Sequence, residues 1–442
     1  MNRWPLNDTI AVLLLSVVML SPLPLGSNRP LFWLISAIFV FVTVAIFLVW
    51  TAMIQKKMPI PFGKYGLLFA VVLGLQLYIL MQVTGIMPNL ESIAPKASLL
   101  SFIRILSYAA FFFLAIQVSQ NTTRANWMLH GIFFSSVGYA LFGFAEVTNF
   151  VDYPHFLGKQ QYIGDATGTF INRNSYATYL GFGILSGMSL IKQRINRTGA
   201  GFCLSFFADI RLASYLVLSV LMVTTLVLTN SRMGVVAFLV AATIFIFRST
   251  AMQNNLKIPT RVIVVATFFL AIPGVQFLYG NGLFERLGSV EKDIDVRFSL
   301  YSQVWEMVRS KPLTGQGADS FAVAFPAFHR LPVSPDLVWD KAHNTYLTNW
   351  AELGMIFGSI PLLLGMIVFV KMCKYVFFRR QDTVLPLLGV CVAVQAGLHS
   401  LVDFSLEIQA NVYVFLAIMA LGFSAAVRSE LDDVWRARHD AD

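Results

Sequence analysis

The sequence predicts an all-α membrane protein with about twelve transmembrane helices. This prediction rests on the amino-acid composition and on the length of the apolar runs. The chain has 442 residues, of which 57% are hydrophobic and only 12% are charged. A soluble domain averages about 45–50% apolar and about 25% charged residues. The apolar runs are continuous and reach the roughly 20 residues that a membrane helix needs, whereas membrane strands would alternate over about ten residues. The sequence therefore predicts a polytopic helical membrane protein.

Twelve apolar runs define the predicted spans. In chain order they are Thr9–Leu25, Leu31–Met53, Tyr65–Val83, Ala97–Val118, Trp127–Val147, Tyr176–Leu190, Leu212–Leu228, Gly234–Phe247, Val262–Tyr279, Leu353–Val370, Val384–Leu401 and Ala410–Val427. The first run follows Arg3 but lacks a small-residue cleavage site, so we interpret it as a span and not as a signal peptide.

The distribution of Lys and Arg predicts the orientation. With the N-terminus inside, the inner segments carry nineteen of these residues, and the outer loops before the long one carry five, namely Arg29, Lys96, Lys159, Arg173 and Arg232. Cationic residues concentrate in cytoplasmic loops. Both termini are therefore predicted to be cytoplasmic. The same bias explains the net charge of +9, and we expect no nucleic-acid partner.

The predicted organisation has four parts. Residues 1–280 hold spans one to nine, 281–344 form a large periplasmic loop, 345–427 hold spans ten to twelve, and 428–442 form a cytoplasmic tail. Within the loop, Asp295–Lys311 places apolar residues four apart and is followed by Pro312. This spacing predicts an amphipathic helix that lies on the membrane surface or caps the bundle.

Three polar clusters precede even-numbered spans, which run from outside to inside. They are Asn172-Arg173-Asn174, Asn230-Ser231-Arg232 and His343-Asn344. Each cluster therefore lies at an outer helix N-terminus, where Asn or Ser can cap the helix and the dipole favours an anion. Arginine offers fork-shaped donors that match phosphate oxygens. If the three helix starts converge, they form a diphosphate site on the outer face.

His343 is the candidate general base. A helix N-terminus disfavours the imidazolium, which leaves a neutral imidazole available to accept a proton. The structural alternatives are a loop histidine bonded to backbone for His343, and interfacial anchors for Arg173 and Arg232.

Other polar residues are weaker candidates for substrate contacts. Arg297, His329 and Arg330 lie in the long loop, where solvated side chains are the simpler interpretation. His399 and Asp403 are four apart and could face one another on one helix, most simply as a structural pair. Arg104 lies inside the fourth span, where a charge needs a partner or a water-filled cavity.

No metal or cofactor is predicted. The three cysteines have no ligand spacing. Asp293-Ile-Asp295 could hold a metal, as a DxD motif does in some glycosyltransferases, but two Asp at a helix start are more often caps.

Five motifs in order resemble the O-antigen ligase and polymerase superfamily over about residues 165–405. They are Gly168–Ala177, Asn230–Gly234, Pro312–Gly317, Ala342–Leu347 with Glu352 and Gly354, and His399–Asp403. The resemblance implies a GT-C-like, inverting, metal-independent glycosyltransferase whose site faces the periplasm. Its donor would be a glycan on undecaprenyl diphosphate, and its acceptor a hydroxyl of the lipid A core or of another glycan.

The resemblance also implies residue roles. Arg173 and Arg232 would hold the diphosphate, and His343 would take the proton of the acceptor hydroxyl. An O-antigen ligase ranks slightly ahead of an O-antigen or exopolysaccharide polymerase. The alternatives from another class are a secondary transporter, which would favour a midplane site and internal repeats, and a lipid-linked glycan flippase.

Overall fold

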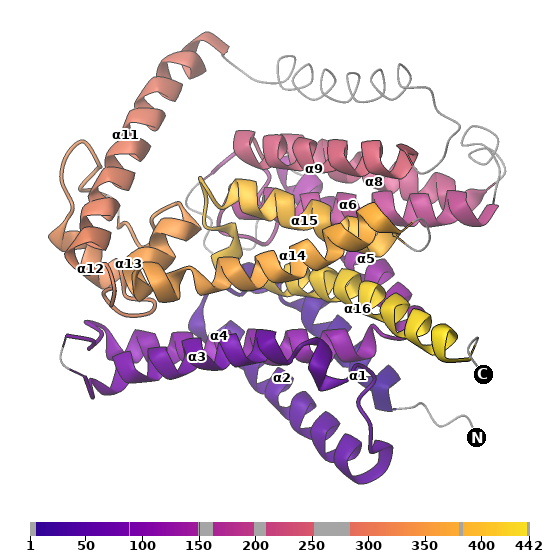
Figure 1. Ribbon diagram of the computed structural model, residues 1–442. Helices are drawn as coiled ribbons and strands as arrows, with labels where there is room; N and C mark the ends of the chain where they lie inside the picture. Colours follow the sequence, from indigo (N-terminus) through magenta and orange to yellow (C-terminus); the bar gives the residue numbers. More distant parts are fainter. Residues whose placement is uncertain are drawn as a thin grey trace.

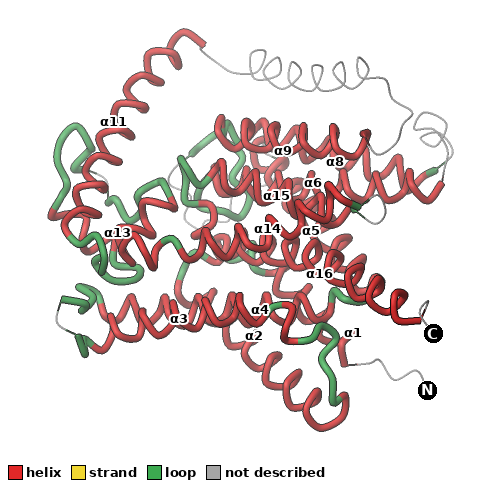
Figure 2. Tube along the Cα trace, in the orientation of Figure 1, coloured by secondary structure: helices red, strands yellow, loops and turns green. Residues whose placement is uncertain are grey.

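The computed structural model of the chain is built from helices that run side by side (Figure 1). It describes residues 6–87, 89–148, 150, 162–198, 209–251, 283–336, 338–379 and 383–439, with the backbone alone at 250–251, 283–295 and 434–439. Helices and turns make up these described residues, and no strand occurs among them (Figure 2). The all-α prediction is confirmed.

Eleven of the predicted spans correspond to described helices. They are α1 (Leu6–Leu20), α2 (Pro30–Trp50), α3 (Gly66–Thr84), α4 (Pro95–Val118), α5 (Thr122–Val147), α6 (Arg173–Thr198), α8 (Ile210–Leu228), α9 (Arg232–Ala251), α14 (Ile360–Phe378), α15 (Val384–His399) and α16 (Gln409–His439). In the described part of the chain, eight helices are long and apolar enough to cross a membrane, and α1 and α15 are shorter apolar helices. The ninth predicted span, Val262–Tyr279, lies outside the described residues. The count of twelve stays a prediction.

α6 lies in the interior of the bundle, although its sequence is too polar for it to count among the eight helices that could cross a membrane by length and hydropathy. It packs against α5, α8, α9 and α15, and most of its first eighteen residues are buried. Small residues allow these close approaches: a Cβ at Gly183 would lie 2.3 Å from Ser136 Cβ on α5. Close packing of small residues is how helices associate inside a bilayer. α6 thus carries its N-terminal residues into the middle of one end of the bundle.

The bounds predicted for the tenth span, Leu353–Val370, are wrong. Its first residues belong to α13 (Thr345–Gly358), and the helix that is long and apolar enough to cross a membrane is α14, which begins at Ile360. α13 is itself broken at Gly354. At Gly354 the backbone has φ 72° and ψ 166°, and an added Cβ would lie 2.2 Å from the carbonyl oxygen of Leu313. Only glycine fits such a position readily. The hydropathy is continuous across the break, so the apolar pattern could not reveal it.

The predicted amphipathic helix is present and is longer than expected, as α11 (Leu283–Ser310). It ends before Pro312. Its buried residues pack into one cluster with α12 (Phe321–Ala324) and α13. The buried members of this cluster are Leu300, Val304, Met307, Val308, Phe321, Ala324, Phe325, Val333, Ala342 and Ala351. α11 therefore belongs to a cap of helices at one end of the bundle (Figure 1).

The first and last helices meet at the opposite end of the bundle from α11–α13 (Figure 1). Near the start of α1, Asp8 pairs with Arg124 at the start of α5, at 2.9 Å. Toward the end of α16, Arg428 Nη1 donates to the carbonyl of Gln120 at 3.0 Å. The two chain ends thus share one end of the bundle, as the charge pattern predicts. That this end is cytoplasmic remains a prediction.

Candidate functional site

The start of α6 presents Arg173 on a capped helix. Asn172 Oδ1 accepts a hydrogen bond from the backbone N–H of Asn174 at 2.7 Å. Arg173 Nη1 lies 2.5 Å from Asp165 Oδ2, and its guanidinium carbon is 5.1 Å from the ring centre of Tyr162. The Nε–H of Arg173 is buried and has no partner among the described residues. The guanidinium is therefore oriented with one donor still unused.

Asp165 joins the start of α9 to the start of α6. Its other carboxylate oxygen accepts a hydrogen bond from Asn230 Nδ2. Asn230 has φ 53°, which turns the chain sharply into α9. Ser231 is buried, and its hydroxyl finds no partner in the described part of the chain. Arg232 is exposed and forms no ion pair with any described residue.

The connection between α15 and α16 (residues 400–408) joins the start of α6 to the start of α13. Asp403 Oδ1 accepts a hydrogen bond from Asn174 Nδ2 at 3.1 Å. From the other side, Asn344 Nδ2 donates to the carbonyl of Leu401 at 2.9 Å, and the Thr345 hydroxyl donates to the carbonyl of Asp403 at 3.2 Å. The three helix starts that carry the predicted clusters therefore meet at one end of the bundle.

His343 is held in an uncommon backbone conformation at this meeting point. Its φ is 51°, and its carbonyl accepts a hydrogen bond from the Tyr301 hydroxyl at 3.0 Å. Asn344 Oδ1 caps α13 by accepting from the N–H groups of Tyr346 and Leu347. The imidazole lies edge-on to Phe404, with 4.9 Å between ring centres. Left-handed backbone at a non-glycine residue persists where surrounding contacts hold it, often at functional sites.

Burial lowers the pKa of His343. The carboxylate of Asp403 raises this pKa, and the guanidinium of Arg297 lowers it further. The carboxylates of Glu407 and Asp340 raise it by smaller amounts. Desolvation disfavours the charged imidazolium. The imidazole is thus neutral near pH 7.

Arg297 on α11 belongs to the same group of residues. It is half-buried, and its charge lowers the pKa of both Tyr162 and His343, so it lies within electrostatic reach of these two residues. It forms no ion pair with a described carboxylate. The two other loop candidates lie elsewhere in the cap. His329 Nε2 is 3.1 Å from the Val333 carbonyl oxygen, and the exposed Arg330 pairs with Glu306 at 2.9 Å.

His399 and Asp403 do not face one another on one helix as predicted. α15 ends at His399, and Asp403 lies in the connection beyond it. His399 is 2% exposed, and its Nδ1 is 2.6 Å from the Thr178 hydroxyl of α6. Ser405 links the two residues, since its hydroxyl donates to Asp403 and lies 3.5 Å from His399 Nδ1.

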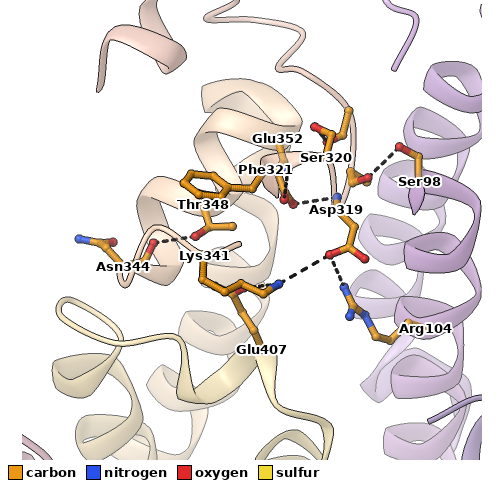
Figure 3. Close-up of polar contacts among 12 residues, drawn as sticks. Ser98, Arg104, Asp319, Ser320, Phe321, Lys341, Asn344, Thr348, Glu352 and Glu407 are labelled. Carbon is orange, nitrogen blue, oxygen red and sulfur yellow. Dashed lines mark hydrogen bonds and ion pairs between the residues drawn. The ribbon is translucent and has the colours of Figure 1, made fainter. Parts of the chain in front are cut away.

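A chain of half-buried charges lies beside the site (Figure 3). Arg104 Nη2 on α4 is 3.3 Å from Asp319 Oδ1, and Lys341 Nζ is 3.7 Å from the same oxygen and 3.0 Å from Glu407 Oε2. The requirement that Arg104 find a partner is met by Asp319. Because Lys341 precedes His343 by two residues and Glu407 lies in the 400–408 connection, the chain of charges anchors both sides of the His343 segment.

The Pro312–Gly317 motif packs where α13 breaks. Gly317 N–H donates to the Glu352 carbonyl at 2.9 Å, and a Cβ at Gly315 would lie 2.3 Å from that carbonyl oxygen. The Glu352 carboxylate accepts from the N–H groups of Asp319 and Phe321. Burial raises the pKa of Glu352 to about 8. This motif positions the cap and the charge network.

Sequence reasoning missed Asp165, Tyr301 and Lys341 as parts of the site. The three clusters themselves contain no carboxylate, but Asp165 contacts both Arg173 and Asn230, and Asp403 contacts Asn174. Among the described residues, no group of three His, Cys, Asp or Glu could hold a metal. The side chains of Asp293 and Asp295 lie outside the described part.

The arrangement of helices defines a multi-pass membrane protein with a polar site at one end of its bundle. Residues 217–362, about a third of the chain, match the family model of O-antigen ligase. This match confirms the resemblance to the O-antigen ligase and polymerase superfamily, and it supports a ligase-type or polymerase-type, glycosyltransferase-like function in polysaccharide biosynthesis. None of the curated proteins matches the chain. The matched range includes Arg232, Arg297 and His343 but not Arg173.

Proposed function

We propose that the protein transfers a glycan from undecaprenyl diphosphate to an acceptor hydroxyl on the periplasmic side, most simply as an O-antigen ligase with the lipid A core as acceptor. One observation carries the proposal: the starts of α6, α9 and α13 meet through Asp165 and the 400–408 connection. The inner-membrane location, the cytoplasmic termini and the GT-C-like architecture are parts of the same proposal.

The site suits a diphosphate because cationic donors and helix N-termini gather there. Arg173 keeps an unused buried Nε–H, and Arg232 and Arg297 have no carboxylate partner among the described residues. Fixed donors of this kind stabilise the negative charge that develops on a leaving diphosphate. Asp165 orients Arg173 and does not cancel the charge of all three arginines.

In the proposed step, the neutral imidazole of His343 accepts the proton of the acceptor hydroxyl. The hydroxyl oxygen attacks the anomeric carbon, the bond from that carbon to the diphosphate oxygen breaks, and the configuration inverts. The departing charge is held by Arg173 and Arg232. Asn172 and Asn344 hold the backbone at the starts of α6 and α13 through their side-chain oxygens. Asn174 donates to Asp403, and the Ser231 hydroxyl, which has no partner among the described residues, is available to a diphosphate oxygen.

We expect Arg232→Ala to reduce transfer by about 10²–10³-fold, because one donor to the developing charge is removed. Arg232→Lys should also lose most of the activity, since a point charge does not reproduce a two-pronged phosphate contact. The measurement is glycan transfer by reconstituted protein. Arg211→Ala, an exposed arginine at the start of α8, is the matched control. Full activity of Arg232→Ala would remove Arg232 from the mechanism.

The pH dependence of transfer should reflect His343. Because burial lowers its pKa, the proton-accepting form persists below the ordinary histidine value of about 6.5. The pH–rate profile should therefore be flat from about pH 7 to pH 8 and should fall only below about pH 6.5. A rate that rises tenfold between about pH 7 and pH 8 would assign the base to another group.

A chelator should leave the rate of transfer unchanged, because arginines supply the electrostatic stabilisation in the proposed step. The assay compares reconstituted protein before and after treatment with EDTA. Strong inhibition that magnesium or manganese reverses would instead make Asp293 and Asp295 candidate ligands.

Identifying the product separates the two members of the superfamily. Purified protein is incubated with lipid-linked glycan, with or without lipid A core. A ligase gives glycan attached to core and nothing without it. Elongation of the lipid-linked glycan without core would establish the polymerase alternative.

A further inference from the structure

A cavity of about 370 Å³ lies at the opposite end of the bundle from the proposed transfer site. Its walls come from the start of α5, the end of α6, the end of α9, the start of α15 and the middle of α16. This is the end at which the first and last helices meet. The cavity is within the size range of small-molecule sites in proteins.

Cationic side chains line this cavity. Lys192 and Arg197 come from α6 and Arg428 from α16, and none of the described residues that line it is acidic. The Arg428 guanidinium is held by hydrogen bonds to the backbone carbonyls of Gln120 and Ser119. Like charges gather here without a carboxylate in the wall.

Three of the acidic side chains at this end are paired with other cations. Asp8 contacts Arg124, Asp209 contacts Arg194, and Glu430 contacts both Lys64 and Lys371, at 3.0 and 3.2 Å. The positive charge of the cavity is therefore not offset by these neighbours.

The walls also offer neutral donors. Asn126 and Gln193 contribute amides. The start of α15 has no side-chain cap and favours an anion through its dipole and its N–H groups, whereas Asn121 already caps α5 and the C-terminal ends of α6 and α9 also line the cavity. The cations and amide donors gathered in this one cavity therefore form a binding site for a phosphate group. If these cations reflected only the general enrichment of Lys and Arg on the cytoplasmic side, we would expect them on exposed helix surfaces and not around one cavity.

We propose that this cavity binds the phosphate of an anionic phospholipid from the leaflet at this end of the bundle. The cavity lies at one end of the bundle, and three of the helices in its walls, α5, α9 and α16, are long and apolar enough to cross a membrane. Basic pockets between such helices on the cytoplasmic side bind anionic headgroups. The occupied cavity would tie together α5, α6, α15 and α16, whose other ends carry the transfer site. A soluble phosphate compound has the same chemistry, and the experiment distinguishes the two sources.

The test measures lipid retention by the full chain. Protein is reconstituted with phosphatidylcholine and phosphatidylglycerol, extracted, and the bound phosphatidylglycerol is counted by native mass spectrometry. We expect Lys192→Gln/Arg197→Gln to retain at least tenfold less phosphatidylglycerol than the unaltered chain. Lys57→Gln/Lys374→Gln removes the same charge from exposed positions outside the cavity and should retain the unaltered amount. Equal losses in the two double variants, or no loss in either, would overturn the proposal.

Two further arms complete the design. Arg197→Gln alone changes an exposed side chain, so it tests the cavity without risk to folding, and it should lower retention severalfold. Inorganic phosphate at about 10 mM should not displace the lipid. If it does, the cavity takes a soluble phosphate compound and the lipid assignment fails. Transfer activity is not the readout, so the result is independent of the proposed function.

Discussion

His343→Ala should lose about 10²–10⁴-fold in the rate of glycan transfer while the protein still inserts and folds. General-base catalysis contributes a factor of this size. The imidazole is half-buried and neutral, and its backbone is held by the Tyr301 hydroxyl and by the α13 cap. Alanine removes the proton acceptor but leaves those backbone contacts in place. The measurement is a single-turnover rate with lipid-linked glycan and acceptor.

His130→Gln is the matched control for this prediction. His130 lies on α5, where its ring contacts the carbonyl of Asn126 and the hydroxyl of Tyr215, away from the three helix starts. We expect the control to transfer at the unaltered rate. If His343→Ala also kept that rate, with a normal elution profile and melting temperature, the imidazole would have no part in the chemistry.

The spans were largely predictable because burial in a bilayer demands apolar length. Eleven predicted spans have a helix in the structure, and the α11 helix follows from its spacing of apolar residues. The tenth span was misplaced for a physical reason. The break at Gly354 depends on a close approach by Leu313, which lies 41 positions earlier in the chain. Hydropathy does not record such a contact.

The cationic residues of the candidate site could be predicted from the sequence, but the contacts that join the three helix starts could not. Capping residues and arginines at helix starts have local signatures in the sequence. The pairing of Arg173 with Asp165 and of Asn174 with Asp403 depends on tertiary packing, and the second pair is separated by 229 residues. His399 illustrates the same limit, because an i to i+4 spacing predicts a shared helix face only if the helix continues.

The half-buried charges couple the first half of the bundle to the His343 segment. Arg104 belongs to α4, and through Asp319 and Lys341 it connects to Glu407 in the 400–408 connection (Figure 3). Lys341 is central, because its ammonium contacts both carboxylates. Its side chain is 17% exposed and that of Glu407 is 12% exposed, so neither charge is well solvated.

Lys341→Met should lower the free energy of unfolding by about 3–5 kcal/mol, because removing one partner leaves a buried charge uncompensated. Lys341→Met/Glu407→Gln should recover most of that loss, since replacing both members of a buried pair is often close to neutral. The measurement is denaturant unfolding of purified protein in detergent. Lys96→Met, an exposed cation at the start of α4, is the control and should change stability little.

The two variants also separate stability from positioning. If the charges serve only to hold the fold, the double variant should regain both stability and transfer. If the Lys341–Glu407 contact sets the position of His343, the double variant should regain stability while transfer stays reduced. A single Lys341→Met variant as stable as the unaltered protein would show that water reaches the pair, and the network would then have no part in anchoring the His343 segment.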